Sequence, residues 1–324
     1  MKKATIITIV AALLLIVSCN VDSEHGIYYQ VATSQPTSGI SIIQSLGCIV
    51  EGEDVTHIFL SDDGLYSTPS TKGGTELVPG SQGKNIRGAY FDINFPVFIY
   101  SDATGTVYTL LGGESTELGN YADYKFEISS NGFAYNKDHY ASVPYGVKDA
   151  AISNPRFNGQ MMLSMDGTTK AKIYTYNSDE EPLSITGLTA NATGFTVAKG
   201  ASSYFVFNDK SVYEVTDTQT ELNDETLVVS GLEAAPTGGY KAVQYSDDTN
   251  TPYLLVRTSK GFTKINTDED EVVEKNVQFL SALNDVVVLD MYTIGNSSKI
   301  AIVTYANGIR IADMENKTVT DDIL

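Results

Sequence analysis

The chain has 324 residues, of which 21 are Lys or Arg and 40 are Asp or Glu, so its formal net charge is −19. Hydrophobic residues make up 42% and charged residues 19%, so the chain can bury a core and does not have the composition of a disordered acidic tail. Phosphate binding needs clustered cations, and with only four arginines the sequence argues against a nucleic-acid partner. The length fits two average domains or one large repetitive domain.

The N-terminus has the layout of a secretory signal peptide. Lys2 and Lys3 precede an apolar run, Ile6–Val17, that only Thr8 interrupts. A membrane-spanning helix needs about 20 apolar residues, so this run is too short to cross a bilayer. We therefore expect export of the chain and removal of this segment.

The run ends in Ile16-Val17-Ser18-Cys19, which resembles the lipobox of bacterial lipoproteins. The resemblance implies cleavage of the bond between Ser18 and Cys19 and lipid attachment at Cys19. The alternative is an ordinary cleaved signal with a cysteine there by coincidence. Several acyl chains bind a membrane firmly, since each buried CH₂ adds about 0.8 kcal/mol. The resemblance therefore implies a membrane partner through Cys19.

These features predict a signal peptide at 1–18, a lipidated polar tether at 19–26 and one domain at 27–324. In enterobacterial lipoproteins Asp after the lipidated Cys favours inner-membrane retention, so Asn20 favours the outer membrane, on its periplasmic or cell-surface side. Cys48 is then the remaining cysteine, and we expect a buried apolar residue there rather than a reactive thiol.

The body contains a repeated unit of an apolar strand, a turn with Ser, Asp, Asn or Gly, and a return strand that often opens with an aliphatic residue and Tyr. Period-2 alternation with β-branched and aromatic residues, together with these turns, predicts hairpins. The six copies are 58–66, 97–108, 161–174, 204–213, 254–262 and 300–309. A further strand pair at 132–143 fills the one long gap and gives seven units with a mean spacing of about 41 residues.

This spacing matches a four-stranded blade of a β-propeller, which takes roughly 40–45 residues. The sequence therefore predicts an all-β fold, a single propeller of seven four-stranded blades, with six or eight blades as alternatives. Gly26-Ile27-Tyr28 resembles a return strand that would pair with the last blade. The absence of Trp excludes the WD signature and Trp-bearing quinoprotein repeats, so the resemblance is to the architecture and not to a subfamily.

Small residues and alternation also predict the flanking strands of each unit. Gly- or Ala-containing segments suit the crowded innermost strands, and short polar segments suit the exposed outer edges. The predicted inner strands are 86–92, 147–153, 193–199, 240–246 and 286–292. The predicted outer strands are 75–78, 183–186, 226–229 and 271–274.

No catalytic, metal or cofactor site stands out, so we expect the protein to have no catalytic residues, no bound metal and no cofactor. His25, His57 and His139 lie too far apart in sequence for usual zinc-ligand spacing, which favours structural or solvated roles. Acidic residues at the hairpin tips favour turn capping over calcium binding. These tip residues are Asp62, Asp63, Asp102, Asp166, Asp209 and Asn307.

Two further groups of residues leave a function open. Acidic residues in the inner strands could form a catalytic carboxylate pair, as in glycosidase propellers. The favoured alternative is that they accept hydrogen bonds from backbone N–H groups of neighbouring blades. These acids are Asp92, Glu127, Asp149 and Asp290. Tyrosines that follow an aliphatic residue suit packing between blades, or the anchoring of a protein or glycan partner. These tyrosines are Tyr28, Tyr66, Tyr108, Tyr174 and Tyr213.

The sequence thus predicts a lipid-anchored bacterial envelope protein that acts as a non-enzymatic binding scaffold for a protein or glycan. Two alternatives stay open: an outer-membrane assembly factor of the propeller-lipoprotein type, and a glycan-acting hydrolase or lyase. Fold alone does not choose among them.

Overall fold

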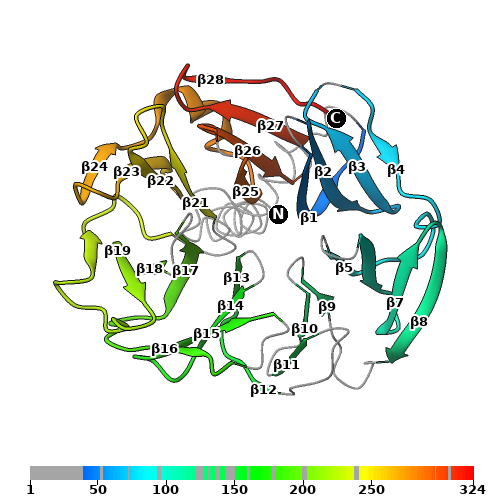
Figure 1. Cartoon of the computed structure of the whole chain (residues 1–324), viewed down its shortest axis with the longest axis horizontal. Helices are drawn as coiled ribbons and strands as arrows, with labels where there is room; N and C mark the ends of the chain where they lie inside the picture. The colour runs from blue at the N-terminus through cyan, green and yellow to red at the C-terminus, as the bar shows by residue number, and fades with distance from the viewer. Residues whose placement is uncertain are drawn as a thin grey trace, which may run out of the picture.

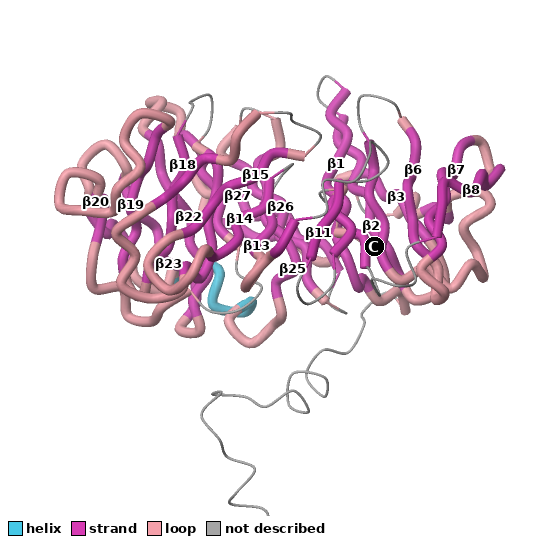
Figure 2. The backbone as a smooth tube through the Cα atoms, turned by 90° about the horizontal axis from the view of Figure 1, so that it is seen from below, coloured by secondary structure: helices cyan, strands magenta, loops and turns pink. Residues whose placement is uncertain are grey.

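The computed structural model describes residues 39–51, 54–71, 73–92, 96–120, 127–129, 132–135, 139–142, 150–158, 161–176, 180–198, 203–236, 241–295, 297–305 and 308–324. These residues form seven four-stranded antiparallel sheets arranged as blades around a central axis (Figure 1). From the side, the ring is a disc whose strands run across its thickness (Figure 2). The predicted β-propeller is confirmed, and the described residues form seven blades, the number that the sequence favoured over six or eight.

Each blade takes its four strands from consecutive sequence, with the first strand at the axis and the fourth at the rim (Figure 1). Blade 1 is β1 (Ile42–Glu51), β2 (Asp54–Ser61), β3 (Leu65–Pro69) and β4 (Glu76–Leu77). Blade 2 is β5 (Gly88–Asp92), β6 (Val97–Ser101), β7 (Thr106–Leu111) and β8 (Glu114–Asn120). Blade 3 is β9 (Glu127–Ile128), β10 (Phe133–Tyr135), β11 (His139–Ser142) and β12 (Ala150–Ala151). Blade 4 is β13 (Arg156–Asn158), β14 (Met161–Met165), β15 (Ala171–Thr175) and β16 (Leu183–Ile185).

The remaining blades complete the ring. Blade 5 is β17 (Ala192–Val197), β18 (Ser203–Asn208), β19 (Ser211–Thr216) and β20 (Leu227–Val229). Blade 6 is β21 (Ala242–Ser246), β22 (Pro252–Thr258), β23 (Gly261–Asn266) and β24 (Glu271–Glu274). A short 3-10 helix, η2 (Gln278–Leu283), leads into blade 7, which is β25 (Val288–Thr293), β26 (Lys299–Thr304), β27 (Gly308–Asp313) and β28 (Thr318–Val319).

The repeated hairpins of the sequence are the second and third strands of the blades. The strand pair at 132–143 corresponds to β10 and β11 of blade 3, so the seventh unit is confirmed. The prediction of an inner strand at 147–153 is wrong, because Ala150–Ala151 forms the outer strand of blade 3 and blade 4 begins at Arg156. Small apolar residues fit either edge of a blade. The predicted strand at 26–28 lies outside the described residues.

Inner strands crowd together near the axis, as the small residues there indicated. A Cβ atom added to Gly88 at the start of β5 would clash with the carbonyl oxygen of Ile128 in β9 and would lie 2.9 Å from the Ile128 nitrogen. Gly88 therefore permits the close approach of blades 2 and 3.

The hydrophobic core lies between blades and is continuous around the ring. Each of its six clusters of buried residues joins neighbouring blades. Four of the predicted tyrosines pack against these clusters, and Tyr28 lies outside the described residues. They are Tyr66, Tyr108, Tyr174 and Tyr213. The tilted ring contact of Tyr174 with Tyr140 of blade 3, with ring centroids 5.0 Å apart, shows this inter-blade role directly.

Blades 1 and 7 close the ring through side chains and the C-terminal residues. Ile42 and Phe59 of blade 1 share a cluster with Val303 and Ile311 of blade 7. Ile323 packs into the same cluster, and its carbonyl accepts a hydrogen bond of 3.3 Å from the backbone N–H of Gly73 in blade 1. Within the described part of the chain, no blade contains a strand from the other end of the sequence.

A buried polar residue occupies the end of the second strand in six blades. These residues are Ser61, Ser101, Ser164, Asn208, Thr258 and Thr304. Most of them hold the adjoining turn or the connection to the inner strand. Asn208, for example, accepts hydrogen bonds from the backbone N–H and the hydroxyl of Thr189 and donates one to the carbonyl of Ala190. This pattern explains why each repeated unit has a polar residue before its turn.

Replacement of Gly88 by Ala is expected to destabilise the protein by about 2–4 kcal/mol, since blades 2 and 3 must separate to admit the methyl group. Gly231→Ala is the matched control, because Gly231 has a positive φ of 71° but open space around it. That variant should lose only about 1–2 kcal/mol of stability, because Ala disfavours the left-handed conformation. Urea unfolding measures both, and equal losses would contradict the close approach.

Asn208→Ala is expected to cost about 1–2 kcal/mol, because it removes the hydrogen bonds that the buried Asn208 side chain makes with the backbone groups of residues 189 and 190. Ser101→Ala is the matched control. The Ser101 hydroxyl is equally buried but has no hydrogen-bond partner among the described residues, so its removal should change stability by less than about 0.5 kcal/mol. Thermal and urea unfolding compare the pair, and a larger loss at Ser101 would contradict the assignment.

Candidate functional site

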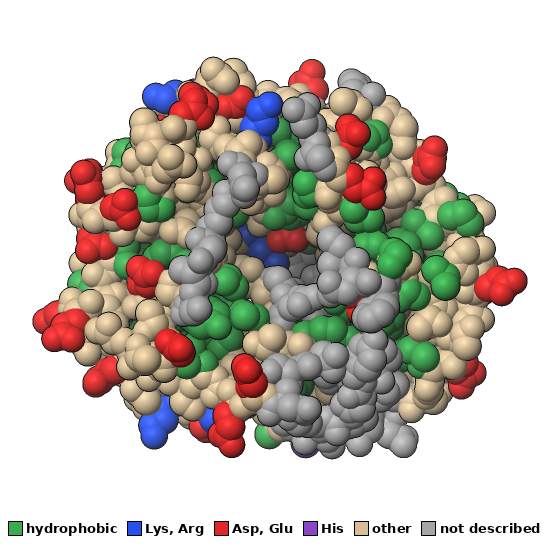
Figure 3. Space-filling view, in the orientation of Figure 1, with side chains coloured by type: hydrophobic (Ala, Val, Ile, Leu, Met, Phe, Trp, Pro, Cys, Tyr) green, Lys and Arg blue, Asp and Glu red, His purple; other side chains and the backbone are tan. Residues whose placement is uncertain are grey.

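A cavity of about 260 Å³ lies on the axis of the ring. Among the residues that line it are Ile43, Gln44, Arg87, Tyr135, Phe157 and Lys241, which come from five different blades or the segments that lead into them. The space-filling view shows both basic (blue) and acidic (red) side chains deep in this central hollow (Figure 3). None of the described lining residues is Asp or Glu, although the chain as a whole is strongly acidic.

The two cations reach the same end of the cavity because of their place in the repeat. Arg87 directly precedes β5 and Lys241 directly precedes β21. Four antiparallel strands return the chain to the end where each blade began, so successive inner strands start at the same end of the ring. The backbone N–H of Arg87 donates to the carbonyl of Ser101 at 2.9 Å. The carbonyl of Lys241 accepts from the N–H of Arg257 at 3.2 Å. Each cation is thus held to the end of the second strand of its own blade.

Polar side chains of the inner strands hold the cavity wall rigid. The Gln44 side chain accepts a hydrogen bond of 3.0 Å from the N–H of Ala89 and donates to the carbonyls of Ala89 and Ile128. The Asn158 amide donates to the carbonyl of Phe195 at 3.2 Å. Backbone groups of neighbouring blades are therefore satisfied by amide side chains, a role that the sequence analysis gave to acids.

Aromatic side chains of blades 3 and 4 form another part of the lining. Tyr135 of β10 and Phe157 of β13 come from neighbouring blades, and their ring centroids lie 4.9 Å apart at an interplanar angle of 41°. Both residues are half-buried and line the cavity. The site thus combines two cations, an apolar aromatic platform and a few hydroxyl groups, including those of Ser45 and Ser129.

The predicted inner-strand acids do not converge on this cavity. Asp92 is buried at the end of β5, and Asp290 faces the contact between blades 1 and 7, where it is close enough to influence Cys48 and Tyr292. Glu127 lies in β9 without a described side chain, and Asp149 lies outside the described residues. Neither described acid lines the cavity, so the structure offers no support for a carboxylate pair there.

His57 is fully buried between blades 1 and 7 and has a structural role. Its Nδ1 is hydrogen-bonded to the hydroxyl of Tyr292 at 2.7 Å and its Nε2 to the hydroxyl of Ser70 at 2.8 Å. A neutral ring satisfies both bonds, because each hydroxyl can donate or accept. Burial lowers the pKa of His57 to about 4. His139 is half-buried in β11, and His25 lies outside the described residues.

Cys48 pairs with His57 in the register of β1 and β2 and is half-buried. Burial, followed by the charge of Asp290, raises the pKa of this thiol to about 11. The thiolate is the reactive form of cysteine, so this environment disfavours reactivity. The expectation of an unreactive thiol therefore agrees with its surroundings.

The acids at the hairpin tips serve their own turns. The Asp102 carboxylate accepts hydrogen bonds from the backbone N–H groups of Thr104 and Thr106 and from the Thr104 hydroxyl. Asp247 makes the same set of bonds with Thr249 and Thr251, which the sequence analysis had not singled out. These Asp-x-Thr-x-Thr turns use the carboxylate as a backbone cap.

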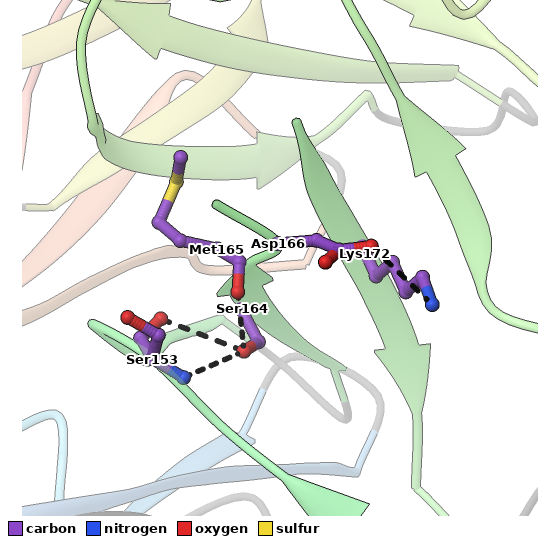
Figure 4. Close-up of polar contacts among 5 residues, drawn as sticks. All are labelled: Ser153, Ser164, Met165, Asp166 and Lys172. Atoms are coloured by element: carbon purple, nitrogen blue, oxygen red, sulfur yellow. Dashed lines mark hydrogen bonds and ion pairs between the residues drawn. The ribbon is translucent and has the colours of Figure 1, made fainter. Parts of the chain in front are cut away.

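In blade 4, an ion pair and a hydrogen bond from a backbone N–H to a side-chain hydroxyl lie close to each other near the end of β14 (Figure 4). Asp166 forms an ion pair of 3.6 Å with Lys172, and the Ser164 hydroxyl accepts from the backbone N–H of Ser153 at 3.0 Å. Within the ranges that the structure describes, no group of three or more His, Cys, Asp or Glu is arranged to hold a metal ion. Asn307 lies outside those ranges.

Ser18, Cys19 and the predicted segments 1–18 and 19–26 lie outside the described residues, so the lipid site and the domain boundaries stay predictions. In the part of the chain that is described, no helix has the length and apolar character needed to span a membrane.

The blades and the axial cavity define this chain as a seven-bladed β-propeller, and solved structures share that fold. PorZ, an essential bacterial surface component of the type-IX secretion system of Porphyromonas gingivalis, matches with a TM-score of 0.50 and 12% identity. That match covers 88% of this chain but only 39% of PorZ, so the chain spans about two fifths of its length.

Hsv2 of a Kluyveromyces yeast, K. marxianus, matches with a TM-score of 0.55 and 9% identity over 86% of this chain and 97% of Hsv2. A variant, KlHsv2 with loop 6CD replaced by a Gly-Ser linker, matches with a TM-score of 0.52 and 8% identity over 85% of this chain and 96% of that chain. No protein-family model matches the sequence. The search of curated proteins finds no match either. The likenesses at these identities show the fold alone.

The sequence analysis missed Arg87 and Lys241. The available signal was a cation directly before a predicted inner strand, in a chain where cations are scarce. Sequence alone could not bring the two together, because they are separated by more than 150 positions and meet only when the ring closes.

The pKa of His57 predicts an acid-sensitive contact between blades 1 and 7. In the unfolded chain His has an ordinary pKa of about 6.5, so the unfolded state binds the proton more tightly. The stability that neutral His57 contributes is complete above about pH 6.5 and is lost as pH falls toward about 4. We expect a loss of about 2–3 kcal/mol from this residue between about pH 7.5 and about pH 4.5.

Urea unfolding of the wild type and of His57→Gln at these two pH values measures this contribution. The wild type should lose more stability on acidification than His57→Gln, since glutamine does not titrate. His139→Gln, at a half-buried position in blade 3, is the matched control for the loss of a histidine. Identical pH dependence in the wild type and His57→Gln would contradict the buried neutral imidazole.

Proposed function

We propose that this protein is a lipid-anchored bacterial envelope protein, tethered at Cys19, that acts as a binding scaffold with its ligand site in the axial cavity. The observation that carries the proposal is the cavity itself. It gathers Arg87, Lys241, Tyr135 and Phe157 from separate blades of an acidic chain, on a ring held rigid by inter-blade contacts. Concave sites with aromatic lining and a few placed polar groups are typical ligand sites.

The envelope setting rests on the sequence. The apolar run and Ile16-Val17-Ser18-Cys19 resemble a lipoprotein signal, and Asn20 favours the outer membrane. The propeller fold is compatible with this setting, since the same fold occurs in PorZ, which is described as a bacterial surface component. A tethered rigid ring would hold its ligand near the membrane without a conformational change of its own.

The lipid anchor is tested by metabolic labelling of cells with radioactive palmitate, followed by membrane fractionation. The wild-type protein should carry label and sediment with membranes, because acyl chains partition strongly into the bilayer. Cys19→Ser should lose both properties. Cys48→Ser is the matched control for loss of a cysteine and should keep them. Label on the Cys19→Ser variant would contradict the anchor.

The position of the ligand site is tested by a photo-crosslinking residue in intact cells. At position 135, on the cavity lining, it should give a crosslinked product, whereas at position 116, on the exposed outer strand of blade 2, it should give none. Crosslinks from position 116 and not from 135 would contradict the axial site. A crosslink from 116 to an outer-membrane insertion machine would favour the assembly-factor alternative.

A further inference from the structure

We propose that the axial cavity binds a single acidic sugar unit of the hexuronate type. Its carboxylate would lie between Arg87 and Lys241, and its ring would pack on Tyr135 and Phe157. This inference rests on the binding function proposed above and names the class of ligand for that site.

Charge supports an anion at the axis. The chain carries a net charge of −19, yet two of its few cations line one small cavity, and none of the described lining residues is acidic. Acidic side chains are also visible deep in the central hollow (Figure 3), so the attraction for an anion is local to Arg87 and Lys241 and is not that of a hollow lined by one sign of charge. The planar guanidinium of Arg87 suits bidentate hydrogen bonding to a carboxylate, and the Lys241 ammonium adds a second donor.

The exposure of the two cations fits a ligand that enters from one end. Arg87 is exposed and Lys241 is half-buried, although both lie directly before inner strands at the same end of the cavity. Arg87 would therefore meet the incoming carboxylate first, and Lys241 would contact it deeper in the cavity.

The aromatic platform and the hydroxyl groups support a sugar ring rather than a bare anion. The rings of Tyr135 and Phe157 are 4.9 Å apart and present apolar surface to the cavity. Inorganic phosphate has no apolar surface to pack against these rings, whereas the C–H face of a pyranose ring can cover them and remove apolar area from water. Ser45 and Ser129 line the same cavity, where their hydroxyl oxygens accept the backbone N–H groups of Gly47 and Phe133, so the lining is polar as well as apolar.

The size of the cavity limits the ligand to one unit. Its volume of about 260 Å³ is below the roughly 300–1,000 Å³ of clefts that hold drug-sized ligands.

Isothermal titration of the full-length protein in detergent tests the proposal with D-glucuronate and D-glucose, which share a ring and differ in the C6 carboxylate. Glucuronate should bind at least about tenfold more tightly than glucose, because a charge-assisted bidentate contact is lost with the carboxylate. Equal binding of the two sugars, or no binding of glucuronate, would overturn the proposal. Inorganic phosphate that binds as tightly as glucuronate would also overturn it, because the ring would then contribute nothing.

Variants locate the site. Arg87→Gln should weaken glucuronate binding about tenfold or more, and Phe157→Leu should weaken it while phosphate binding stays unchanged. Arg310→Gln removes an arginine from β27 of blade 7, away from the cavity lining, and should bind like the wild type. Thermal unfolding confirms that each variant is folded. If glucuronate does not bind but a crosslink from position 135 is still obtained, the proposed ligand class is wrong. The axial binding site proposed above is then still supported.

Discussion

Closure of the ring between blades 1 and 7 is the constraint on which the axial site depends. Residues from blades 1, 3, 4 and 7 and from the segments before blades 2 and 6 meet at the axis only if the two ends of the propeller are joined. In the described chain this join uses no exchanged strand. It consists of a shared hydrophobic cluster, the His57–Tyr292 hydrogen bond and the bond from Gly73 to Ile323.

Such a join depends on side-chain packing more than on a backbone ladder. A buried histidine that must stay neutral makes it sensitive to acid, since charging the ring costs the desolvation of an imidazolium. The remaining blades are joined by similar clusters, but there the chain itself continues from one blade to the next. Blades 1 and 7 lack that covalent link, so the contact of His57 with Tyr292 and the docking of Ile323 replace it.

The sequence predicted most of the fold because its strongest signals are local. Alternation and turn residues marked the second and third strands, and their spacing marked the blades. Inner and outer strands were harder to distinguish, since Ala150–Ala151 is as small as an inner strand but lies at the rim. The long outer strand β8 was not predicted, because its residues, Glu114–Asn120, are almost entirely polar. The roles expected for Cys48 and His57 followed from their isolation in sequence and agree with the half-buried position of Cys48 and the buried position of His57.

The site was less predictable because it is made by residues that are remote in sequence. Acids in inner strands were considered as candidates, but Asp290 faces a neighbouring blade and Asp92 is buried away from the cavity lining. The cations were passed over because a single Arg or Lys before a strand carries no motif. Only closure of the ring brings Arg87 and Lys241 together at one axial cavity.

A crystal structure of the full-length protein with saturating D-glucuronate tests the central claim most directly, namely that the axial cavity is the ligand site. The account predicts a bound sugar in the cavity, with its carboxylate within hydrogen-bond distance of Arg87 and Lys241 and its ring against Tyr135 and Phe157. A sugar bound elsewhere, or a cavity that stays free of sugar under these conditions, would contradict it.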